Sequence, residues 1–311
     1  MGYRIGSFNV KKLSYATKDE DLNDNVSAKR EYDVIGSIIK ENFSIVALQE
    51  VLNKNVIKML GLPSHWKYEW SRSYSKISDS EEGYAFAWDT RRIQLISDPH
   101  IWGQYSKDPS LGRYGLLRQP FYARFKAIGP NCEFRLINTH IRFSPKKANE
   151  DLVDIKAFEA RRREFDILSK QILNIIEDKR YGNYMPAYTM ILGDYNLNLN
   201  SSSVTKNCLK EDFFVIQDGN CNKKIVTVQD KLTTLKYKKI DQGTGQNCYE
   251  FDGYASNYDH FTYNETYFNE SGLEVKTDII DTVSRYSNND FERHYRKISD
   301  HIPIMMEINL K

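Results

Sequence analysis

Short runs of apolar residues recur along the chain and predict strands. Most of these runs are about 5 to 8 residues long, which is the usual length of a strand in a globular protein. The predicted strands cover residues 3–10, 44–49, 83–88, 121–125, 134–140, 188–192, 258–263 and 302–308. The spacing of these runs indicates that strands account for most of the regular structure.

Two longer stretches, 27–43 and 154–178, predict helices, because apolar residues recur in them at spacings of three and four. Each predicted helix is followed by a strand that ends in a carboxylate, Glu50 in one case and Asp194 in the other. This alternation predicts an α/β protein in which two mixed sheets pack on each other with helices outside. No linker rich in Pro or Gly divides the chain, so residues 1–311 are predicted to form one domain. Residues 197–257 are the least regular and are predicted to be surface loops with a hairpin.

Composition supports a globular protein and excludes several other classes. The chain has 311 residues, of which 13% are aromatic, with only 16 Gly and 8 Pro. These values do not fit a collagenous, low-complexity or disordered chain. The formal net charge is +2, from 44 Lys and Arg against 42 Asp and Glu, which favours neither a generally basic nucleic-acid binder nor an acidic tail.

No apolar run approaches the roughly 18 residues that a transmembrane helix needs. The N-terminus also lacks the basic and then apolar layout of a signal peptide. We therefore expect a cytoplasmic protein, or a secreted one whose leader is missing from this chain, with no stable membrane association.

The four cysteines are Cys132, Cys208, Cys221 and Cys248, and they show no spacing typical of a zinc site. They are interpreted as free thiols. Alternatively, Cys221 and Cys248 close a loop if the protein works outside the reducing cytosol.

Polar residues of a few kinds stand at or near the ends of the predicted strands, where open α/β sheets gather their ligands. In chain order these are Asn9, Glu50, His140, Asp194, Asn196, Asp259, Asp300 and His301. Each one alone has an ordinary explanation, because Asn and Asp after a strand commonly open a turn. Their occurrence together at several strand ends predicts a catalytic site.

These residues resemble the endonuclease/exonuclease/phosphatase superfamily and, within it, the deoxyribonuclease I branch. The resemblance extends from Phe8-Asn9 to Ser299-Asp300-His301, and its most specific part is Gly193-Asp194-Tyr195-Asn196 followed by that C-terminal motif. The family implies a four-layered α/β sandwich with a metal-dependent active site at one edge. It also implies hydrolysis of phosphodiester or phosphomonoester bonds.

The resemblance assigns metal binding to Glu50, with Asn9 and Asp300 beside it. Carboxylate and amide oxygens are hard ligands, which suit Mg²⁺ or Mn²⁺. The metal is expected to act as a Lewis acid and to orient the substrate for in-line displacement. A structural Ca²⁺ is a further cofactor that the resemblance allows.

The resemblance also assigns catalytic roles. His301, held by Asp259, acts on the base side, and His140 pairs with an acidic residue and serves the phosphate or the leaving group. That acidic residue is expected to be Glu82, with Glu81 as the alternative one position away. Asp194 orients or deprotonates the attacking water. Asn196 donates hydrogen bonds to the phosphate.

Position 140 and Arg118 favour the deoxyribonuclease I branch over the abasic-site endonucleases, which carry Tyr where this chain has His140. Arg118 stands in Arg118-Gln119-Pro120, similar to the segment of that branch that holds a phosphate-contacting arginine. An ordinary ion pair explains Arg118 equally well. The side chains with which that branch reads the minor groove are replaced here by Leu52 and Ser80. Tyr74, Lys11 or Lys12 are candidate substitutes.

Basic residues cluster in residues 223–239, which hold six lysines and one acidic residue. Lys236, Lys238 and Lys239, together with Lys11, are the predicted contacts to DNA phosphates, which supply most sequence-independent affinity. The alternative is that these charges form a solvated face. The same alternative is favoured for residues 161–163, three arginines on a predicted helix.

The sequence therefore predicts a divalent-metal-dependent DNA endonuclease with little sequence preference. The first alternative is a phosphoesterase acting on a phospholipid or inositol phosphate. Trp66 and Trp70 are the nearest candidates for a membrane-dipping segment, although core packing explains them as well. The second alternative is an inactive relative that only binds nucleic acid or a protein. A cytosolic nuclease with weak sequence preference would also need restraint by an inhibitor, a compartment or a regulatory protein, none of which the sequence identifies.

Overall fold

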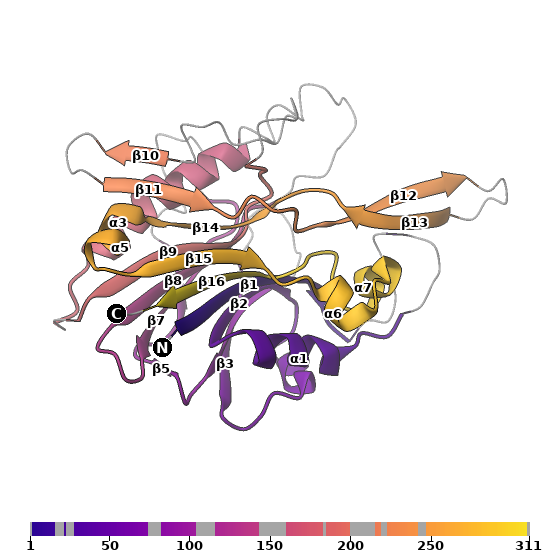
Figure 1. Cartoon of the computed structure of the whole chain (residues 1–311), viewed down its shortest axis with the longest axis horizontal. Coiled ribbons are helices and arrows are strands. Elements are labelled where there is room, and N and C mark those ends of the chain that lie inside the picture. Colours follow the sequence, from indigo (N-terminus) through magenta and orange to yellow (C-terminus); the bar gives the residue numbers. More distant parts are fainter. Residues whose placement is uncertain are drawn as a thin grey trace.

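Two β-sheets lie face to face at the centre of the computed structural model, with helices on their outer faces (Figure 1). The structure describes residues 2–15, 22, 28–73, 82–103, 116–142, 160–182, 185–199, 215–218, 223–241 and 247–309. The first sheet has the strand order β15-β16-β1-β2-β4-β3. The second has the order β10-β11-β14-β9-β8-β7-β5, and β6 pairs with β7.

The strands of the first sheet are β1 (Gly2–Leu13), β2 (Ile45–Val51), β3 (Trp66–Arg72), β4 (Gly83–Asp89), β15 (Glu274–Ile279) and β16 (Ile304–Asn309). Those of the second sheet are β5 (Ile93–Leu95), β6 (His100–Ile101), β7 (Phe121–Ala127), β8 (Glu133–His140), β9 (Ala187–Asp194), β10 (Val215–Asp218), β11 (Lys223–Val228) and β14 (Asp259–Asn264). A separate two-stranded hairpin, β12 (Leu235–Asp241) and β13 (Asn247–Tyr254), extends away from the sheets (Figure 1).

The helices are α1 (Tyr32–Asn42), α3 (Leu173–Asp178), α5 (Glu265–Glu270), α6 (Thr282–Ser287) and α7 (Phe291–Lys297), with a 3-10 helix η1 (Lys54–Leu60). Residues 160–178 are helical throughout and include α3 and a π-helical segment, η3 (Ile167–Ile172). Since α1 and the helix 160–178 each connect two parallel strands, β1 to β2 and β8 to β9, each half of the chain contains one βαβ unit. The remaining strand pairs are antiparallel, so both sheets are mixed.

Strand alternation explains why the chain forms layers. In β1, Tyr3 and Ile5 point into the core between the two sheets, whereas Phe8 and Val10 pack in the cluster that includes α1. A third cluster, under the helix 160–178, contains Phe165 and covers the outer face of the second sheet. The predicted four-layered α/β sandwich is therefore confirmed.

Each predicted strand is present, with ends that differ by a few residues. The first helix is shorter than predicted and begins at Tyr32. The guanidinium of Arg30 donates to the carbonyl oxygens of Val10 and Ile298, which ties the preceding segment to two other parts of the chain. The predicted loop region 197–257 does contain a hairpin, β12–β13, but it also supplies β11 to the second sheet.

The tryptophans considered as membrane-dipping residues belong to the core. Trp66 is buried, and the indole N–H of the half-buried Trp70 donates to the carbonyl of Val51 at 2.9 Å. Both lie on β3, a strand that the sequence analysis missed. In the described residues, no helix has the length and apolar character that crossing a membrane requires.

The helix 160–178 carries charge on its inner side. Arg161 and Glu164 are both buried, and among the described residues the Oε1 atom of Glu164 has no hydrogen-bond partner. Burial raises the pKa of Glu164 to about 8, although a hydrogen bond from the Leu117 backbone and the charge of Arg118 oppose this rise. The arginine run at 161–163 therefore does not form a uniformly solvated face.

We expect Glu164→Gln to stabilise the protein at alkaline pH. The unfolded carboxyl ionises near its ordinary pKa of 4.5, whereas the folded one remains protonated up to about 8. The folded state therefore loses stability progressively as pH rises between these two values, and glutamine removes that loss. The melting temperature of Glu164→Gln should exceed that of the parent by several degrees at pH 8 and by little at pH 5. Glu270→Gln, an exposed replacement on α5, is the control, and equal pH profiles for the two variants would contradict this account.

Candidate active site

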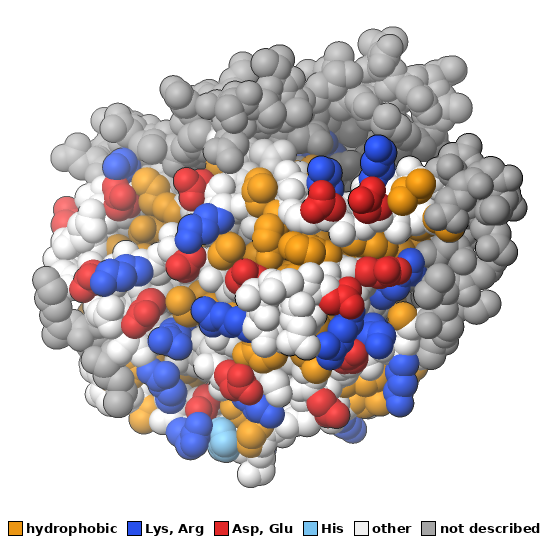
Figure 2. Space-filling view, turned by 45° about the vertical axis from the view of Figure 1, so that its right-hand side comes forward, with side chains coloured by type: hydrophobic (Ala, Val, Ile, Leu, Met, Phe, Trp, Pro, Cys, Tyr) orange, Lys and Arg blue, Asp and Glu red, His pale blue; other side chains and the backbone are white. Residues whose placement is uncertain are grey.

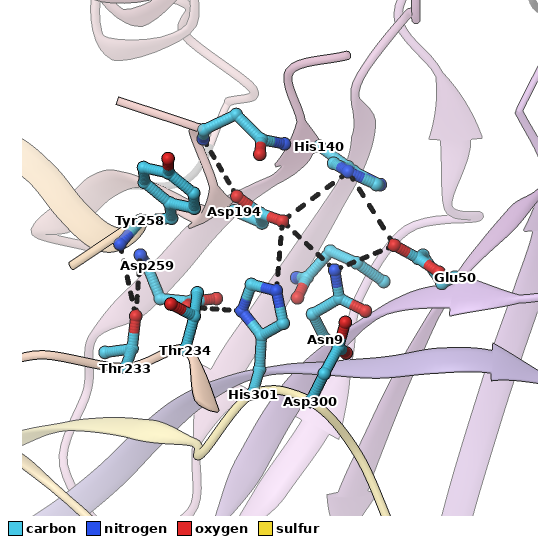
Figure 3. A network of polar contacts seen from close by, with 12 residues as sticks. Asn9, Glu50, His140, Asp194, Thr233, Thr234, Tyr258, Asp259, Asp300 and His301 are labelled. Carbon is cyan, nitrogen blue, oxygen red and sulfur yellow. Dashed lines mark hydrogen bonds and ion pairs between the residues drawn. The ribbon is translucent and has the colours of Figure 1, made fainter. Parts of the chain in front are cut away.

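The polar residues at the strand ends converge at one edge of the sandwich (Figure 3). The two parallel pairs end at this edge, which brings Asn9 and Glu50 from the first sheet close to His140 and Asp194 from the second. Asp259 opens β14, which runs antiparallel to β9 and pairs with it at Asp194. Strands from both halves of the chain thus place polar side chains at the same edge of the sandwich.

Asn9 links two carboxylates. Its Nδ2 atom donates to Glu50 Oε1 at 3.0 Å and to Asp194 Oδ2 at 3.1 Å. Its Oδ1 atom accepts from the backbone N–H of Lys11 at 3.0 Å, and the backbone N–H of Lys12 donates to Glu50 Oε2 at 2.9 Å. The segment that follows Asn9 therefore wraps around the side chains of Asn9 and Glu50.

Backbone conformation at this edge is strained. Glu50 has a φ of 59°, and Lys11 and Lys12 have φ values of 43° and 46°. Non-glycine residues in the left-handed region cost about 1 to 3 kcal/mol each and cluster at functional sites. The strain in β1 and β2 coincides with the position of Glu50, the carboxylate that the family resemblance assigns to metal binding.

Gly193 must be glycine for steric reasons. Its φ is 151°, and a Cβ atom there would lie 1.8 Å from the carbonyl oxygen of Thr139. Three residues after Gly193, Asn196 has a φ of 51°, and its backbone N–H donates to Asp194 Oδ1 at 2.8 Å. The Asn196 side-chain Nδ2 donates to the Ile141 carbonyl at 2.8 Å. The Gly-Asp-x-Asn motif thus holds Asp194 and connects β9 to the end of β8.

His301 and Asp259 form a close pair, with 2.7 Å between Nδ1 and Oδ2. Ser299 holds this region to β1, because its hydroxyl donates to the Asn9 carbonyl and accepts from the His301 backbone N–H. Burial lowers the pKa of His301, but the negative charges of Asp259 and Asp194 outweigh this effect and raise it well above its ordinary value. His301 therefore favours the charged form.

His140 lies in a second arrangement of charges, with Glu82 and Arg118. The Arg118 Nη1 atom donates to His140 Nδ1 at 2.7 Å, and Arg118 Nη2 lies 2.7 Å from Glu82 Oε2. Glu82 Oε2 is 3.4 Å from His140 Nδ1. Burial would raise the pKa of Glu82, but His140 and Arg118 lower it to about 2. Arg118 is thus a buried residue that bridges Glu82 and His140, rather than an arginine of an exposed ion pair.

Both imidazoles face the same carboxylate oxygen. Asp194 Oδ2 lies 3.5 Å from His140 Nε2 and 3.7 Å from His301 Nε2. Burial raises the pKa of Asp194 to about 6, and the two histidines oppose that rise. An acid of this pKa, held between two imidazoles, is suited to proton transfer near neutral pH.

The oxygen donors at this edge fit a loosely held Mg²⁺ or Mn²⁺. Such ions commonly bind one or two protein carboxylates and keep several waters. Glu50 lies beside the amide of Asn9, and Asp300 is half-buried next to His301 (Figure 3). Burial alone would raise the pKa of Asp300. The charges of His301 and Lys11 outweigh this effect and lower the pKa below its ordinary value, so the carboxylate stays ionised. Within the described part of the chain, no three His, Cys, Asp or Glu side chains form a ready-made cage, and the structural Ca²⁺ stays a prediction.

Three of the six lysines in 223–239 have acidic neighbours in the fold. Among the described contacts, Lys223 lies near Glu177 and Asp178, Lys224 near Glu265, and Lys231 near Asp278. The other three lysines of this run, Lys236, Lys238 and Lys239, are the predicted DNA contacts, and they are exposed on β12.

Strand β13 adds Glu250 and Asp252 beside these lysines, and Glu250 is the cross-strand partner of Lys238. Basic and acidic side chains intermingle on the face seen in Figure 2. Lys11 is buried, with its ammonium 3.5 Å from the centre of the Tyr295 ring.

The sequence analysis missed three buried polar residues beneath the site. The Tyr84 hydroxyl accepts from the His140 backbone N–H at 3.1 Å. Gln49 Nε2 donates to Asn138 Oδ1 at 2.8 Å, which joins the two sheets just behind Glu50. The available signal was a polar residue inside an otherwise apolar strand, as in Ala47-Leu48-Gln49 and Leu136-Ile137-Asn138.

Some predicted residues lie outside the described part of the chain. These are Tyr74, Ser80, Glu81, Cys208 and Cys221. The proposed Cys221–Cys248 pairing and the alternative register at Glu81 therefore stay predictions.

The amino-acid sequence matches no family model and no curated protein. In contrast, solved structures align over nearly the whole chain. An endonuclease/exonuclease/phosphatase family protein from Bacteroides thetaiotaomicron aligns with a TM-score of 0.58 at 15% identity, covering 100% of this chain and 98% of its own. A mannosyl-6-phosphatase from the same organism aligns with a TM-score of 0.56 at 14% identity, covering 99% of this chain and 100% of its own.

A third similar structure is ANGEL2, a 2′,3′-cyclic phosphatase in complex with adenosine-2′,3′-vanadate. It aligns with a TM-score of 0.56 at 11% identity, covering 99% of this chain and 96% of its own. Each of these alignments extends over 99% or more of this chain. The chain therefore has the fold of the endonuclease/exonuclease/phosphatase superfamily.

Proposed function

We propose that this chain is a divalent-metal-dependent phosphodiesterase, and specifically a DNA endonuclease with little sequence preference. The observation that carries the proposal is the approach of two histidines, each held by a carboxylate or an arginine, to Asp194 Oδ2 at 3.5 and 3.7 Å. Hydrolysis of a phosphodiester needs a base for water, stabilisation of phosphate charge and an acid for the leaving oxygen. The edge supplies side chains for each of these tasks.

Glu50 and Asp300, with Asn9 beside Glu50, are the residues that would hold the metal. When bound, Mg²⁺ or Mn²⁺ supplies Lewis-acid stabilisation of negative charge on the phosphate. Asp194 accepts a proton from the attacking water, and Asp259 fixes the ring of His301 through Nδ1. Arg118 contacts Nδ1 of His140, so Nε2 is the ring nitrogen that faces Asp194 and would serve the phosphate or the leaving group.

Nucleic acid is the proposed substrate because His140 and Arg118 fit the deoxyribonuclease I pattern in the sequence, and ANGEL2 provides a neighbour of this fold with an adenosine ligand. The mannosyl-6-phosphatase shows that this fold also serves phosphomonoesters. Strand β3 is disfavoured as a membrane anchor. Trp66 is buried, and Trp70 donates a hydrogen bond to the carbonyl of the buried Val51.

A substrate panel tests the proposed function. The purified chain is incubated with supercoiled plasmid, linear duplex DNA, single-stranded oligonucleotides, RNA, phospholipid and sugar phosphates, in Mg²⁺, Mn²⁺ or EDTA. We expect metal-dependent nicking of plasmid that Asp194→Asn abolishes. Nicking that persists in EDTA or in Asp194→Asn would refute the mechanism. Turnover of lipid or sugar phosphate without nicking would replace the substrate assignment and retain the phosphoesterase chemistry.

The three exposed lysines of β12 provide a separate prediction. If Lys236, Lys238 and Lys239 contact DNA phosphates, replacing all three with Gln should reduce the slope of log affinity against log salt by about 2 to 3. The measurement is fluorescence anisotropy of a DNA duplex in Ca²⁺, at salt concentrations from 50 to about 300 mM.

The matched control replaces Lys67, Lys126 and Lys276 with Gln. Their cross-strand partners are Trp88, Glu133 and Glu307, respectively. These positions lie toward the side of the sheets that is remote from the candidate site. The control has the same change in charge and should keep the parent slope. An unchanged slope in the β12 variant would show that these three lysines do not contact DNA phosphates. The acidic neighbours Glu250 and Asp252 would then account for the lack of binding.

A further inference from the structure

Residues 233–235 run between the two parts of the chain that carry Asp259 and His301 (Figure 3). Asp259 opens β14 in the second sheet, whereas His301 precedes β16 in the first. The pair therefore spans the two sheets and depends on whatever fixes one backbone relative to the other. The segment 233–235 leads directly into β12 and contacts both backbones.

Thr233 grips the Asp259 side through its hydroxyl. The Oγ1 atom accepts from the backbone N–H of Tyr258 at 3.1 Å and from that of Asp259 at 3.4 Å. The Tyr258 carbonyl in turn accepts from the Tyr195 N–H at 2.7 Å, one residue after Asp194. The peptide before Asp259 is thus held from both sides.

The same residue grips the His301 side through its backbone. The carbonyl of Thr233 accepts from the Ile302 N–H at 2.8 Å, and Thr234 forms a β-bridge with His301. The N–H of Leu235 donates to the Asp300 carbonyl at 2.7 Å. Thr233 is fully buried, so water does not replace these bonds if they are lost.

We infer that Thr233 is a positioning residue for the Asp259–His301 pair, a role that rests on the proposed function. Its hydroxyl fixes the backbone from which the Asp259 carboxylate projects, and its carbonyl fixes the backbone next to His301. Catalytic groups must stay close to their productive geometry, and a displacement of about 1 Å can cost about 100-fold in rate. Loss of the hydroxyl should therefore lower kcat by displacing Asp259 and, with it, the His301 ring.

The test compares Thr233→Val, which keeps the shape but loses the hydroxyl, with Thr233→Ser, which keeps the hydroxyl. We expect Thr233→Val to lower kcat by about 10- to 100-fold while KM for plasmid stays within about twofold. Thr233→Ser should stay within about threefold of the parent. Thr233→Ala is a second variant without the hydroxyl, in case valine prevents folding.

Thr227→Val is the matched control. Thr227 is also buried, on β11, and its hydroxyl bonds to the Thr262 hydroxyl at 2.9 Å rather than to the Asp259 segment. Melting temperatures report the structural cost of each change. We expect Thr227→Val to melt at a lower temperature but to keep kcat within about threefold of the parent. A fall in kcat that follows melting temperature in both variants would overturn the inference.

A double-mutant cycle with Asp259→Asn tests whether Thr233 acts through the pair. In that background Thr233→Val should lower kcat by less than about threefold, because the pair is already weakened. Multiplicative losses, with an active parent, would overturn the role of Thr233 and leave the proposed function intact. A folded parent without metal-dependent hydrolysis of any phosphoester in the panel would overturn both.

Discussion

Replacement of His301 by Ala is expected to lower kcat/KM for plasmid nicking by about 10³- to 10⁴-fold. His301 is held at 2.7 Å by Asp259, and its other ring nitrogen is 3.7 Å from Asp194. Alanine removes the imidazole and also leaves the Asp259 carboxylate buried without its partner. The substitution therefore removes a proton carrier and uncouples a second acidic group from the site.

The measurement is a time course of plasmid nicking at saturating Mg²⁺, with enzyme in a range wide enough to detect the residual rate. His65→Ala is the control, because His65 precedes β3 at the end of the first sheet remote from Asn9. We expect His65→Ala to keep the parent rate within about twofold. Circular dichroism should show that His301→Ala retains the fold. A folded His301→Ala variant with more than about one tenth of the parent activity would remove His301 from the mechanism.

The architecture was predictable because its signals are local. Alternating apolar runs and two helical periods are enough to indicate β1–α1–β2 and β8–helix–β9, and the structure makes each strand pair parallel. β3 was missed although Trp66, Tyr68 and Trp70 alternate with polar residues. Its aromatic side chains were judged by type rather than by spacing.

The candidate site was predictable in its membership and less so in its contacts. Glu50, Asp194 and His301 lie at strand ends, Asn9 lies where the regular pairing of β1 with β2 breaks, and a sheet of this topology brings these positions together. The bond from Arg118 to His140 joins β8 to a residue before β7, and no local pattern indicates it. Positioning by Thr233 is equally invisible, because a Thr-Thr pair in a loop has no distinguishing periodicity.

Charge shows the same limit. Counted along the sequence, residues 223–239 are strongly basic. In the fold, however, Glu177, Glu265 and Asp278 lie beside three of these lysines. Conversely, the near-zero net charge hides a group of carboxylates around Asn9. Electrostatic complementarity to a substrate depends on which side chains are neighbours in space, and that requires the tertiary structure.

The second large effect is expected from the metal and from Glu50. EDTA should abolish activity, and added Mg²⁺ or Mn²⁺ should restore it. Glu50→Gln should raise the metal concentration for half-maximal activity by at least about tenfold, because an amide lacks the charge that attracts a hard cation. Both carboxylate oxygens of Glu50 already accept hydrogen bonds, from Asn9 and from the Lys12 backbone, so the side chain is held ready for a ligand.

Two further measurements separate metal binding from folding. Calorimetric titration with Mn²⁺ should show the same weakening for Glu50→Gln, whereas Glu69→Gln, a half-buried replacement on β3, should bind as the parent does. Without metal, Glu50→Gln should melt close to the parent, because it loses one accepted hydrogen bond but also removes one negative charge beside Asp194, the carboxylate that shares the Asn9 amide with Glu50. An unchanged metal titration in a stable Glu50→Gln variant would move the metal to other ligands. A strongly destabilised variant would instead make Glu50 a structural residue, and its αL backbone a feature of the fold rather than of the site.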